Sequence, residues 1–148
     1  MADCSHTCEL VHHISIRSSI ENVYLALTTE EEIKGWWTDG VILSQRVGGD
    51  AVFTFASGAR HLRMIIEKLD RPFHVRWSCE GGTLPGWIGT TLDFELKPQS
   101  AGSIFLDFRH AGWKASDDER HFCNTMWGHL FVILQEYVEK GARNPYWQ

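Results

Sequence analysis

The sequence predicts an α+β fold in which a curved antiparallel β-sheet wraps around a long C-terminal helix. Capping-box patterns at 18–21 (SSIE) and 29–32 (TEEE) predict two short helices in succession, because a hydroxyl and a carboxylate at this spacing satisfy the free N–H groups of a helix start. Between residues 41 and 112 the apolar residues recur with a period of two, which is typical of half-exposed antiparallel strands. A broad apolar stripe near the C-terminus predicts the long helix.

The first part of the chain predicts a strand over 9–17, a helix with an apolar face, and a second helix from Glu30 to about Trp37. This second helix ends in two adjacent tryptophans, Trp36 and Trp37. Neighbouring residues point about 100° apart on a helix and to opposite faces of a strand, so the two indoles cannot share one core surface. We therefore expect one to anchor in the core and the other to lie at the rim of a cavity.

Five or six strands should follow, joined by short turns into one curved sheet. Residues of one parity are expected to face inward: Phe53 and Phe55; Leu62, Met64 and Ile66; Phe73, Val75, Trp77 and Cys79; Ile88, Leu92, Phe94 and Leu96; Ile104, Leu106, Phe108 and His110. Asp93, Glu95 and Arg109 have the outward parity, which predicts a solvated face.

The long helix should begin at a third capping box, 116–119 (SDDE), and stop at Gly141. Its stripe comprises Phe122, Met126, Leu130, Ile133, Leu134 and Tyr137, with Trp127 and Phe131 on one flank. Gly128 interrupts this helix at a cost of about 1 kcal/mol relative to alanine. It could mark the close approach of another chain or a local bend.

Composition limits the range of functions. The chain has 148 residues, enough for one domain with a real core, and we place that domain at 9–142 with tails at 1–8 and 143–148. The net charge is 14 − 19 = −5 with scattered basic residues, which disfavours nucleic acid and anionic membranes as partners. The first residues lack a secretory signal pattern and no apolar run is long enough to span a bilayer, so we expect a cytoplasmic protein.

The four cysteines are too few and too dispersed for a disulfide framework. Cys4 and Cys8, with His6, His12 and His13, could attract zinc, but their spacing matches no standard finger and the segment lies at the terminus. We expect no native metal site and no cofactor.

The stretch SIRSSIENVYLALTTEEEIKGWWT resembles the opening signature of the START-related, birch-pollen-allergen-like superfamily, often called SRPBCC. More narrowly, the chain is similar to the branch related to the activator of the heat-shock-protein-90 ATPase. The later segments VGGDAVFTF, VRWSCEGG, GTTLDFELKP, FRHAGW and MWGHLFVILQEYVEKG agree in order, so the resemblance extends from about Val11 to Gly141. It implies the helix-grip arrangement, with the sheet around the last helix, and is specific for fold rather than activity.

The resemblance also implies that the space between the last helix and the sheet holds an apolar small molecule. Each inward side chain could instead pack in a hydrophobic core without a cavity, but large aromatic rings commonly line ligand pockets. The residues expected to contact a ligand are Trp37, Phe53, Phe55, Trp77, Phe94, Phe108, His110, Trp113, Met126, Trp127 and Leu130.

His110 has two interpretations. It could be a buried imidazole hydrogen-bonded to a neighbour, or a polar group that orients a ligand or acts as a general acid/base. The sequence contains no phosphate loop, zinc-protease helix or nucleophile elbow. We therefore name no catalytic residue.

Three functions follow from this sequence. The first is non-enzymatic binding of an apolar or amphipathic small molecule, such as a lipid, in an internal cavity. The second is a cyclase- or hydratase-like enzyme that uses the same cavity. The third, from the branch alone, is a stress-response module that binds a chaperone and regulates its ATPase. A homodimer is compatible with each, either through an edge strand or through the helix flank that carries Phe131, and the sequence does not decide between them.

Overall fold

The computed structural model describes residues 7–114 and 118–147. Its elements, in chain order, are β1 (Thr7–Ile16), α1 (Ile20–Thr28), α2 (Glu30–Ile33), β2 (Gly40–Leu43), β3 (Asp50–Phe55), η1 (Ala56–Gly58), β4 (Arg60–Asp70), β5 (His74–Gly82), η2 (Pro85–Trp87), β6 (Thr91–Ser100), β7 (Ser103–Lys114) and α3 (Glu119–Lys140). Within the described residues, none of the helices is long and apolar enough to cross a membrane.

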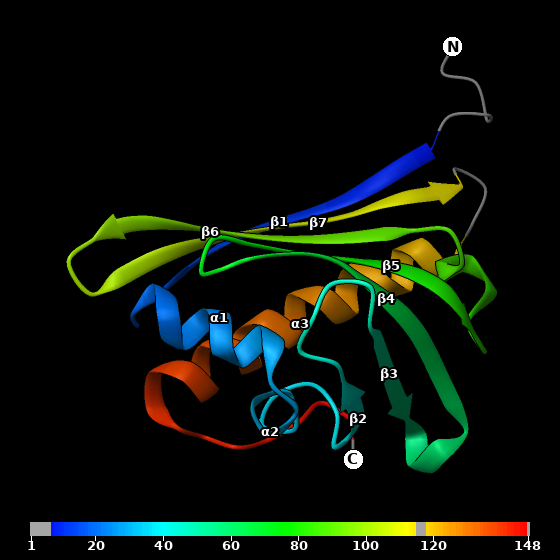
Figure 1. Ribbon diagram of the computed structural model, residues 1–148, viewed down its shortest axis with the longest axis horizontal. Coiled ribbons are helices and arrows are strands. Elements are labelled where there is room, and N and C mark those ends of the chain that lie inside the picture. The colour runs from blue at the N-terminus through cyan, green and yellow to red at the C-terminus, as the bar shows by residue number, and fades with distance from the viewer. Residues whose placement is uncertain (1–6, 115–117, 148) are drawn as a thin grey trace.

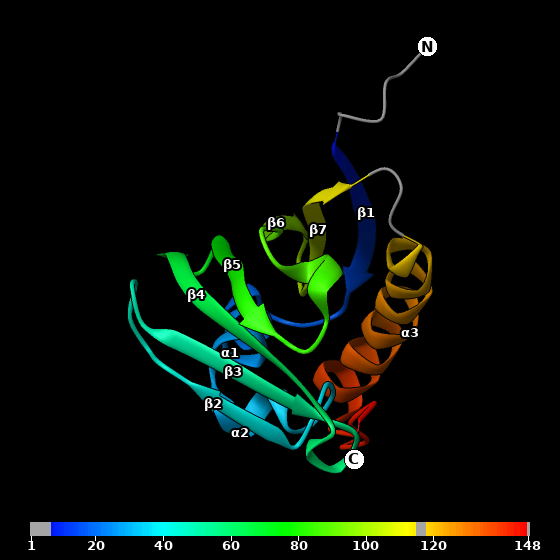
Figure 2. The same cartoon turned by 90° about the vertical axis from the view of Figure 1, so that its right-hand side faces the viewer.

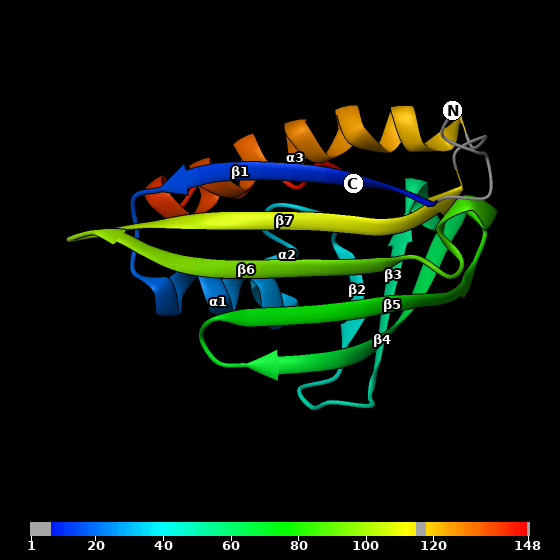
Figure 3. The same ribbon diagram turned by 90° about the horizontal axis from the view of Figure 1, so that it is seen from above.

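The seven strands form one antiparallel sheet in the order β1-β7-β6-β5-β4-β3-β2. Strands β2 to β6 each pair with the next strand in the sequence, and β1 forms the edge opposite β2 by pairing with β7 (Figure 3). The sheet bends, and α1 and α3 both lie on its inner side (Figure 1, Figure 2). The predicted helix-grip α+β fold is confirmed.

The helix starts differ from the predicted capping boxes. Ser19, not Ser18, caps α1: its hydroxyl accepts a hydrogen bond from the backbone N–H of Asn22 at 3.1 Å. Glu21 instead pairs with Arg71, whose Nε donates to it at 2.7 Å. A carboxylate with a nearby guanidinium has a stronger partner than a helix N–H.

The second box was only partly right, and the third lies partly outside the described residues. Thr29 stands at the N-cap of α2 but makes no side-chain cap, since its hydroxyl donates back to the carbonyl of Leu25 at 2.7 Å. For α3, residues 116 and 117 lie outside the described residues; the helix begins at Glu119. Gly141 ends it in the left-handed region, with φ 72°, as predicted.

Both tryptophans of the adjacent pair are fully buried, so the expectation of one rim residue is wrong. Helix α2 ends at Ile33, four residues short of Trp37, and a turn carries the pair. The angle of about 100° between neighbouring side chains on a helix therefore does not apply to this pair. The indole of Trp36 donates to the carbonyl of Ala26 at 2.9 Å, while Trp37 stacks on Phe53 with ring centroids 4.5 Å apart.

The inward positions predicted for the strands and the last helix are mostly buried, with three exceptions. Phe73 and Ile88 are each 49% exposed, because Phe73 lies in the turn before β5 and Ile88 follows η2 outside any strand. Phe122, assigned to the helix stripe, is 54% exposed near the start of α3. The remaining apolar inward residues of the strands are buried in one hydrophobic cluster, while Ile133 and Tyr137 of the helix stripe pack against it half-buried.

Asp93 is not solvated, contrary to the outward-parity expectation. It is only 9% exposed, and its Oδ1 lies 2.6 Å from Nε2 of His74 and 2.7 Å from Nε of Arg76. These side chains from the neighbouring strand cover the carboxylate on the outer face. Arg109, by contrast, is exposed as expected and lies 3.3 Å from Glu9.

Residues beyond the predicted boundary at 142 contact the domain. Backbone N–H groups of Asn144, Tyr146 and Trp147 donate to the carbonyls of residues 35, 36 and 37 at 2.9, 3.1 and 2.9 Å. This places the C-terminal segment against the turn that carries the tryptophan pair.

Candidate functional site

A pocket of about 450 Å³ opens between the first half of α3 and one end of the sheet. Its walls come from the end of β3, the start of β4, the β5–β6 connection, α3 and the C-terminal segment. The lining residues are Phe55, Arg60, Leu62, Thr83, Leu84, Trp87, Glu119, Phe122, Cys123, Met126 and Trp147. Most of these side chains are apolar, and the two charged ones are Arg60 and Glu119.

The β5–β6 connection packs against α3 on one side and against β4 on the other. The indole N–H of Trp87 donates to Sγ of Cys123 at 3.2 Å, and the backbone N–H of Gly86 donates to Oε1 of Glu119 at 3.2 Å. At the β4 side, a Cβ on Gly82 would lie 2.4 Å from the carbonyl oxygen of His61. Only glycine allows this close approach, and its φ of 131° also disfavours other residues.

The opposite rim is a tight hairpin between β3 and β4. Ala56 and Ser57 have φ of 51° and 57°, in the left-handed region that non-glycine residues rarely adopt. Phe55 at its base packs edge-on against Trp147, with ring centroids 5.7 Å apart. The C-terminal tryptophan thus completes the wall.

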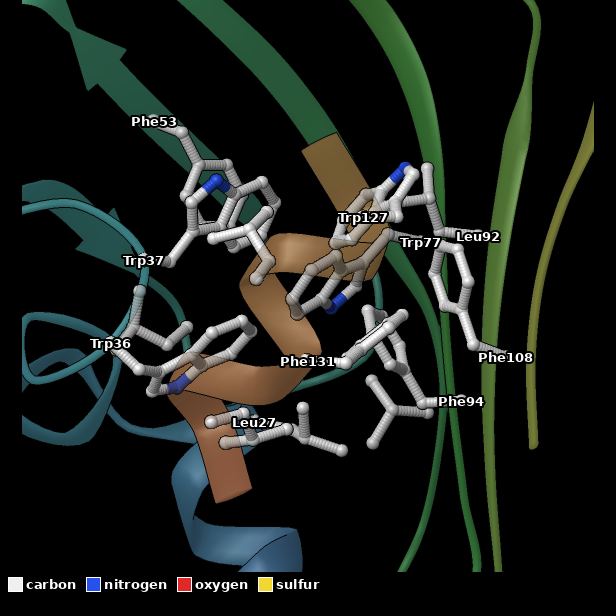
Figure 4. Close-up of a cluster of buried hydrophobic side chains, with 14 of the residues drawn as sticks. Leu27, Trp36, Trp37, Phe53, Trp77, Leu92, Phe94, Phe108, Trp127 and Phe131 are labelled. Atoms are coloured by element: carbon white, nitrogen blue, oxygen red, sulfur yellow. The ribbon is translucent and has the colours of Figure 1, made fainter. Parts of the chain in front are cut away.

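Beyond the pocket, aromatic rings fill the space between α3 and the sheet (Figure 4). Trp127 of α3 lies in van der Waals range of Phe108, with centroids 4.4 Å apart, and of Trp37, at 5.2 Å. Trp77 contacts Phe94 edge-on at 5.1 Å. All of these rings are almost fully buried. This pocket therefore lies at one end of the grip, and rings fill the centre.

Two of the eleven predicted ligand contacts, Phe55 and Met126, line the pocket. The other nine are buried behind it: Trp37, Phe53, Trp77, Phe94, Phe108, His110, Trp113, Trp127 and Leu130. Their role as ligand contacts stays a prediction. Met126 belongs both to the pocket lining and to the core cluster, so it lies at the boundary between the two.

Sequence reasoning missed most of the lining, including Arg60, Thr83, Trp87 and Trp147. Arg60 is the first residue of β4, and the other three come from the β5–β6 connection and the C-terminal segment, where no periodicity indicates a direction. One signal was available: Trp87 and Trp147 lie outside the alternating strand pattern, each close to a proline.

His110 is a fully buried, hydrogen-bonded imidazole. The indole of Trp127 donates to its Nδ1 at 3.1 Å, which assigns the proton to Nε2, and Nε2 then donates to the hydroxyl of Thr90 at 2.9 Å. Thr90 in turn donates to the carbonyl of Trp87 at 2.6 Å. Burial lowers the pKa of His110 to about 3. Both ring nitrogens are thus occupied, as in the first of the two interpretations from the sequence.

The described residues contain no group of three or more histidine, cysteine or acidic side chains placed to hold a metal ion. Cys8 and Cys79 are free thiols. His12 lies 2.9 Å from the side chain of Asn124 on α3, whereas His13 pairs with Asp107 of the sheet. Cys4 and His6 of the possible zinc cluster lie outside the described residues.

Comparison with known families identifies the family to which this chain is similar. The family described as activator of Hsp90 ATPase homolog 1-like protein matches residues 17–139. No curated protein matches this sequence.

Solved structures give the same fold. The Aha1 dimer from Colwellia psychrerythraea, a solution structure, is 29% identical, with a TM-score of 0.79 over 90% of this chain and 98% of that chain. A Mesorhizobium loti protein is 16% identical, with a TM-score of 0.80 over 90% and 98%. A Chromobacterium violaceum protein is 22% identical, with a TM-score of 0.73 over 88% and 96%. The last two likenesses show the fold alone.

Proposed function

The chain belongs to the family of activator of Hsp90 ATPase homolog 1-like proteins, and from that premise we propose that it binds an apolar or amphipathic small molecule in the pocket beside α3. The pocket is the single observation that carries this proposal. Its volume of about 450 Å³ falls within the usual range of small-molecule sites, about 300–1,000 Å³. Its mainly apolar wall with a few polar groups at the mouth is the usual composition of such sites.

The predicted ligand contacts that do not line the pocket lie behind it in the core. Met126 separates the pocket from the rings behind it, and methionine has three rotatable bonds that let it adapt to a guest. We expect a ligand to contact Trp127 and Trp37 only when Met126 changes rotamer. A ligand that stays outside this boundary would leave the core rings unchanged.

The first experiment measures uptake of N-phenylnaphthylamine, a neutral apolar dye, by energy transfer from the tryptophans. Trp87 and Trp147 line the pocket, so a bound dye lies beside two donors. We expect saturable binding. Phe122→Ala should weaken dye binding about fivefold. Full burial of a phenylalanine contributes about 1.5–3 kcal/mol, and a bound dye can bury only the exposed part of this ring, which is 54% exposed.

Val132→Ala is the matched control for that variant. Val132 is 57% exposed on the same helix but does not line the pocket, so its loss should leave dye affinity unchanged. Uptake that never saturates, or equal effects of the two substitutions, would refute binding at this pocket.

An enzyme of the cyclase or hydratase class would use the same pocket. Its acid/base candidate, His110, is sealed behind Trp87 and Trp127, with both nitrogens hydrogen-bonded. A ligand in the pocket does not reach the imidazole in this packing. The geometry therefore favours binding over catalysis by His110.

The second candidate function is regulation of a chaperone ATPase. The family description and the 29% identical Aha1 relative favour it. We expect the purified protein to increase ATP hydrolysis by a heat-shock protein 90 from the same cell. Unchanged turnover at saturating protein would reject this candidate without affecting the small-molecule proposal.

A second copy of this chain is the remaining partner that a relative suggests, because the Colwellia psychrerythraea structure is a dimer. In this chain β2 is a sheet edge, and Ile42 on it is 70% exposed. Such an edge offers unpaired backbone groups to a second strand. We propose dimerisation through β2, and the molar mass by light scattering tests it: Ile42→Lys should shift a dimer to the monomer, while a wild-type monomer would refute the proposal.

A further inference from the structure

Arg60 is an unpaired cation at the mouth of the pocket. It is the first residue of β4 and is exposed. Among the described residues, no hydrogen bond or ion pair reaches its guanidinium. The other arginines of the sheet differ: Arg63 lies 3.0 Å from Asp50, and Arg76 lies 2.7 Å from Asp93. In this acidic protein of net charge −5, Arg60 is the arginine of the described strands that has no carboxylate partner.

The neighbouring polar groups of the pocket already have protein partners. The hydroxyl of Thr83 accepts from the backbone N–H of His61 at 2.9 Å. The carboxylate of Glu119 accepts from the backbone N–H of Gly86 on the opposite wall. The guanidinium of Arg60 is therefore the charged group of this lining that can take a ligand atom without breaking a contact within the described residues.

From this charge pattern we infer that the pocket selects amphiphiles with a single carboxylate, whose head group pairs with Arg60. This inference rests on the proposed binding function and specifies its ligand class. The alkyl chain extends from the mouth along Leu62, Leu84 and Trp87 toward Met126. A guanidinium presents a planar fork of donors that matches a carboxylate bidentately.

A ligand head group with a single negative charge fits the charges at the mouth of the pocket. Glu119 contributes a negative charge to the same lining, so a dianionic head such as a phosphate monoester would face repulsion with only one cation to offset it. A neutral head such as an alcohol would bury the same chain but leave Arg60 unused. The three head groups thus rank as carboxylate, then alcohol, then phosphate.

Competition against the bound dye tests the inference with three ligands of equal chain length: decanoate, decanol and decyl phosphate. With the wild type we expect decanoate to bind about fivefold more tightly than decanol, because an exposed ion pair contributes up to about 1 kcal/mol. Added salt should weaken decanoate and leave decanol unchanged. Lengthening the carboxylate from octanoate to decanoate should increase affinity about fourfold per methylene, which corresponds to about 0.8 kcal/mol each.

Substitution of the arginine isolates its role. Arg60→Gln should reduce decanoate affinity to that of decanol and leave decanol affinity unchanged. Arg46→Gln is the matched control, because the Arg46 guanidinium is also exposed and unpaired among the described residues and does not line the pocket. It should change neither affinity. Arg60→Lys should keep part of the preference.

The outcomes separate the inference from the proposed function. Equal affinities of decanoate and decanol, unchanged by Arg60→Gln, would overturn the carboxylate inference while the pocket still binds. Tighter binding of decyl phosphate would overturn it as well. Failure of the dye itself to bind saturably would remove the proposed function on which the inference rests.

Discussion

Replacement of Gly35 by alanine should destabilise the protein through one aromatic ring. Gly35 lies in the turn before the tryptophan pair, and the ring of Tyr137 from α3 packs directly on it. An added Cβ would lie 2.4 Å from Cε1 and 2.7 Å from Cζ of that ring. The Tyr137 hydroxyl donates to Oε1 of Glu32 at 2.7 Å, and burial, with Glu32 nearby, raises the pKa of Tyr137 to about 12. The ring is therefore fixed as a protonated donor and cannot move without loss of this bond.

The magnitude follows from three contributions. Overpacking costs about 1–3 kcal/mol, and loss of the hydrogen bond between Tyr137 and Glu32 costs about 1 kcal/mol. Replacing glycine by alanine recovers about 0.4–1 kcal/mol through the unfolded chain. We expect Gly35→Ala to lower the free energy of unfolding by about 1–3 kcal/mol, which corresponds to about 2–4 °C in Tm for each kcal/mol.

Urea unfolding in a double-mutant cycle with Tyr137→Ala checks this reasoning. In the Tyr137→Ala background the ring is gone, so Gly35→Ala should be neutral or slightly stabilising. The coupling free energy between the two positions should then be at least about 1 kcal/mol. The same destabilisation in both backgrounds, or none in the wild type, would refute a clash with Tyr137 as the cause.

Three further predictions concern other positions. Gly128→Ala should raise the free energy of unfolding by about 1 kcal/mol in urea, since the nearest atom to an added Cβ is 3.8 Å away; a loss would contradict the room seen there. Burial lowers the pKa of His110 to about 3 from 6.5, so unfolding takes up a proton between these values. Stability should therefore fall as pH drops from 6.5 toward 3, by up to about 1.4 kcal/mol per pH unit, and His110→Gln should remove that part of the slope; an unchanged slope would argue against this assignment. Ser19→Ala should cost about 1 kcal/mol by thermal unfolding while Ser18→Ala costs much less, and the reverse order would restore the predicted cap.

Gly128 illustrates how a local rule succeeds only in part. The sequence identified its cost within a helix, yet could not say whether the close approach of another chain or a local bend required it. In the structure α3 is continuous across this position, and the nearest atom to a Cβ is Cε1 of His12 at ordinary contact distance. We find no structural requirement for glycine there among the described residues.

The burial of Asp93 and of the tryptophan pair could not be predicted from parity. Alternation assigned Asp93 to the outer face correctly, but burial there depends on the side chains of the next strand, His74 and Arg76. For Trp36 and Trp37, the turn after α2 sets the direction of each indole, and turn geometry has no period to detect.

The sequence by itself determined the order of the elements, the inward faces of the strands and the end of the last helix at Gly141, because period and capping chemistry act between residues close in the chain. Only the tertiary structure decided which space is filled and which is open. The pocket is bounded by Arg60, Trp87, Met126 and Trp147, which lie far apart in the sequence. Its existence depends on how their volumes meet, and no local pattern records that.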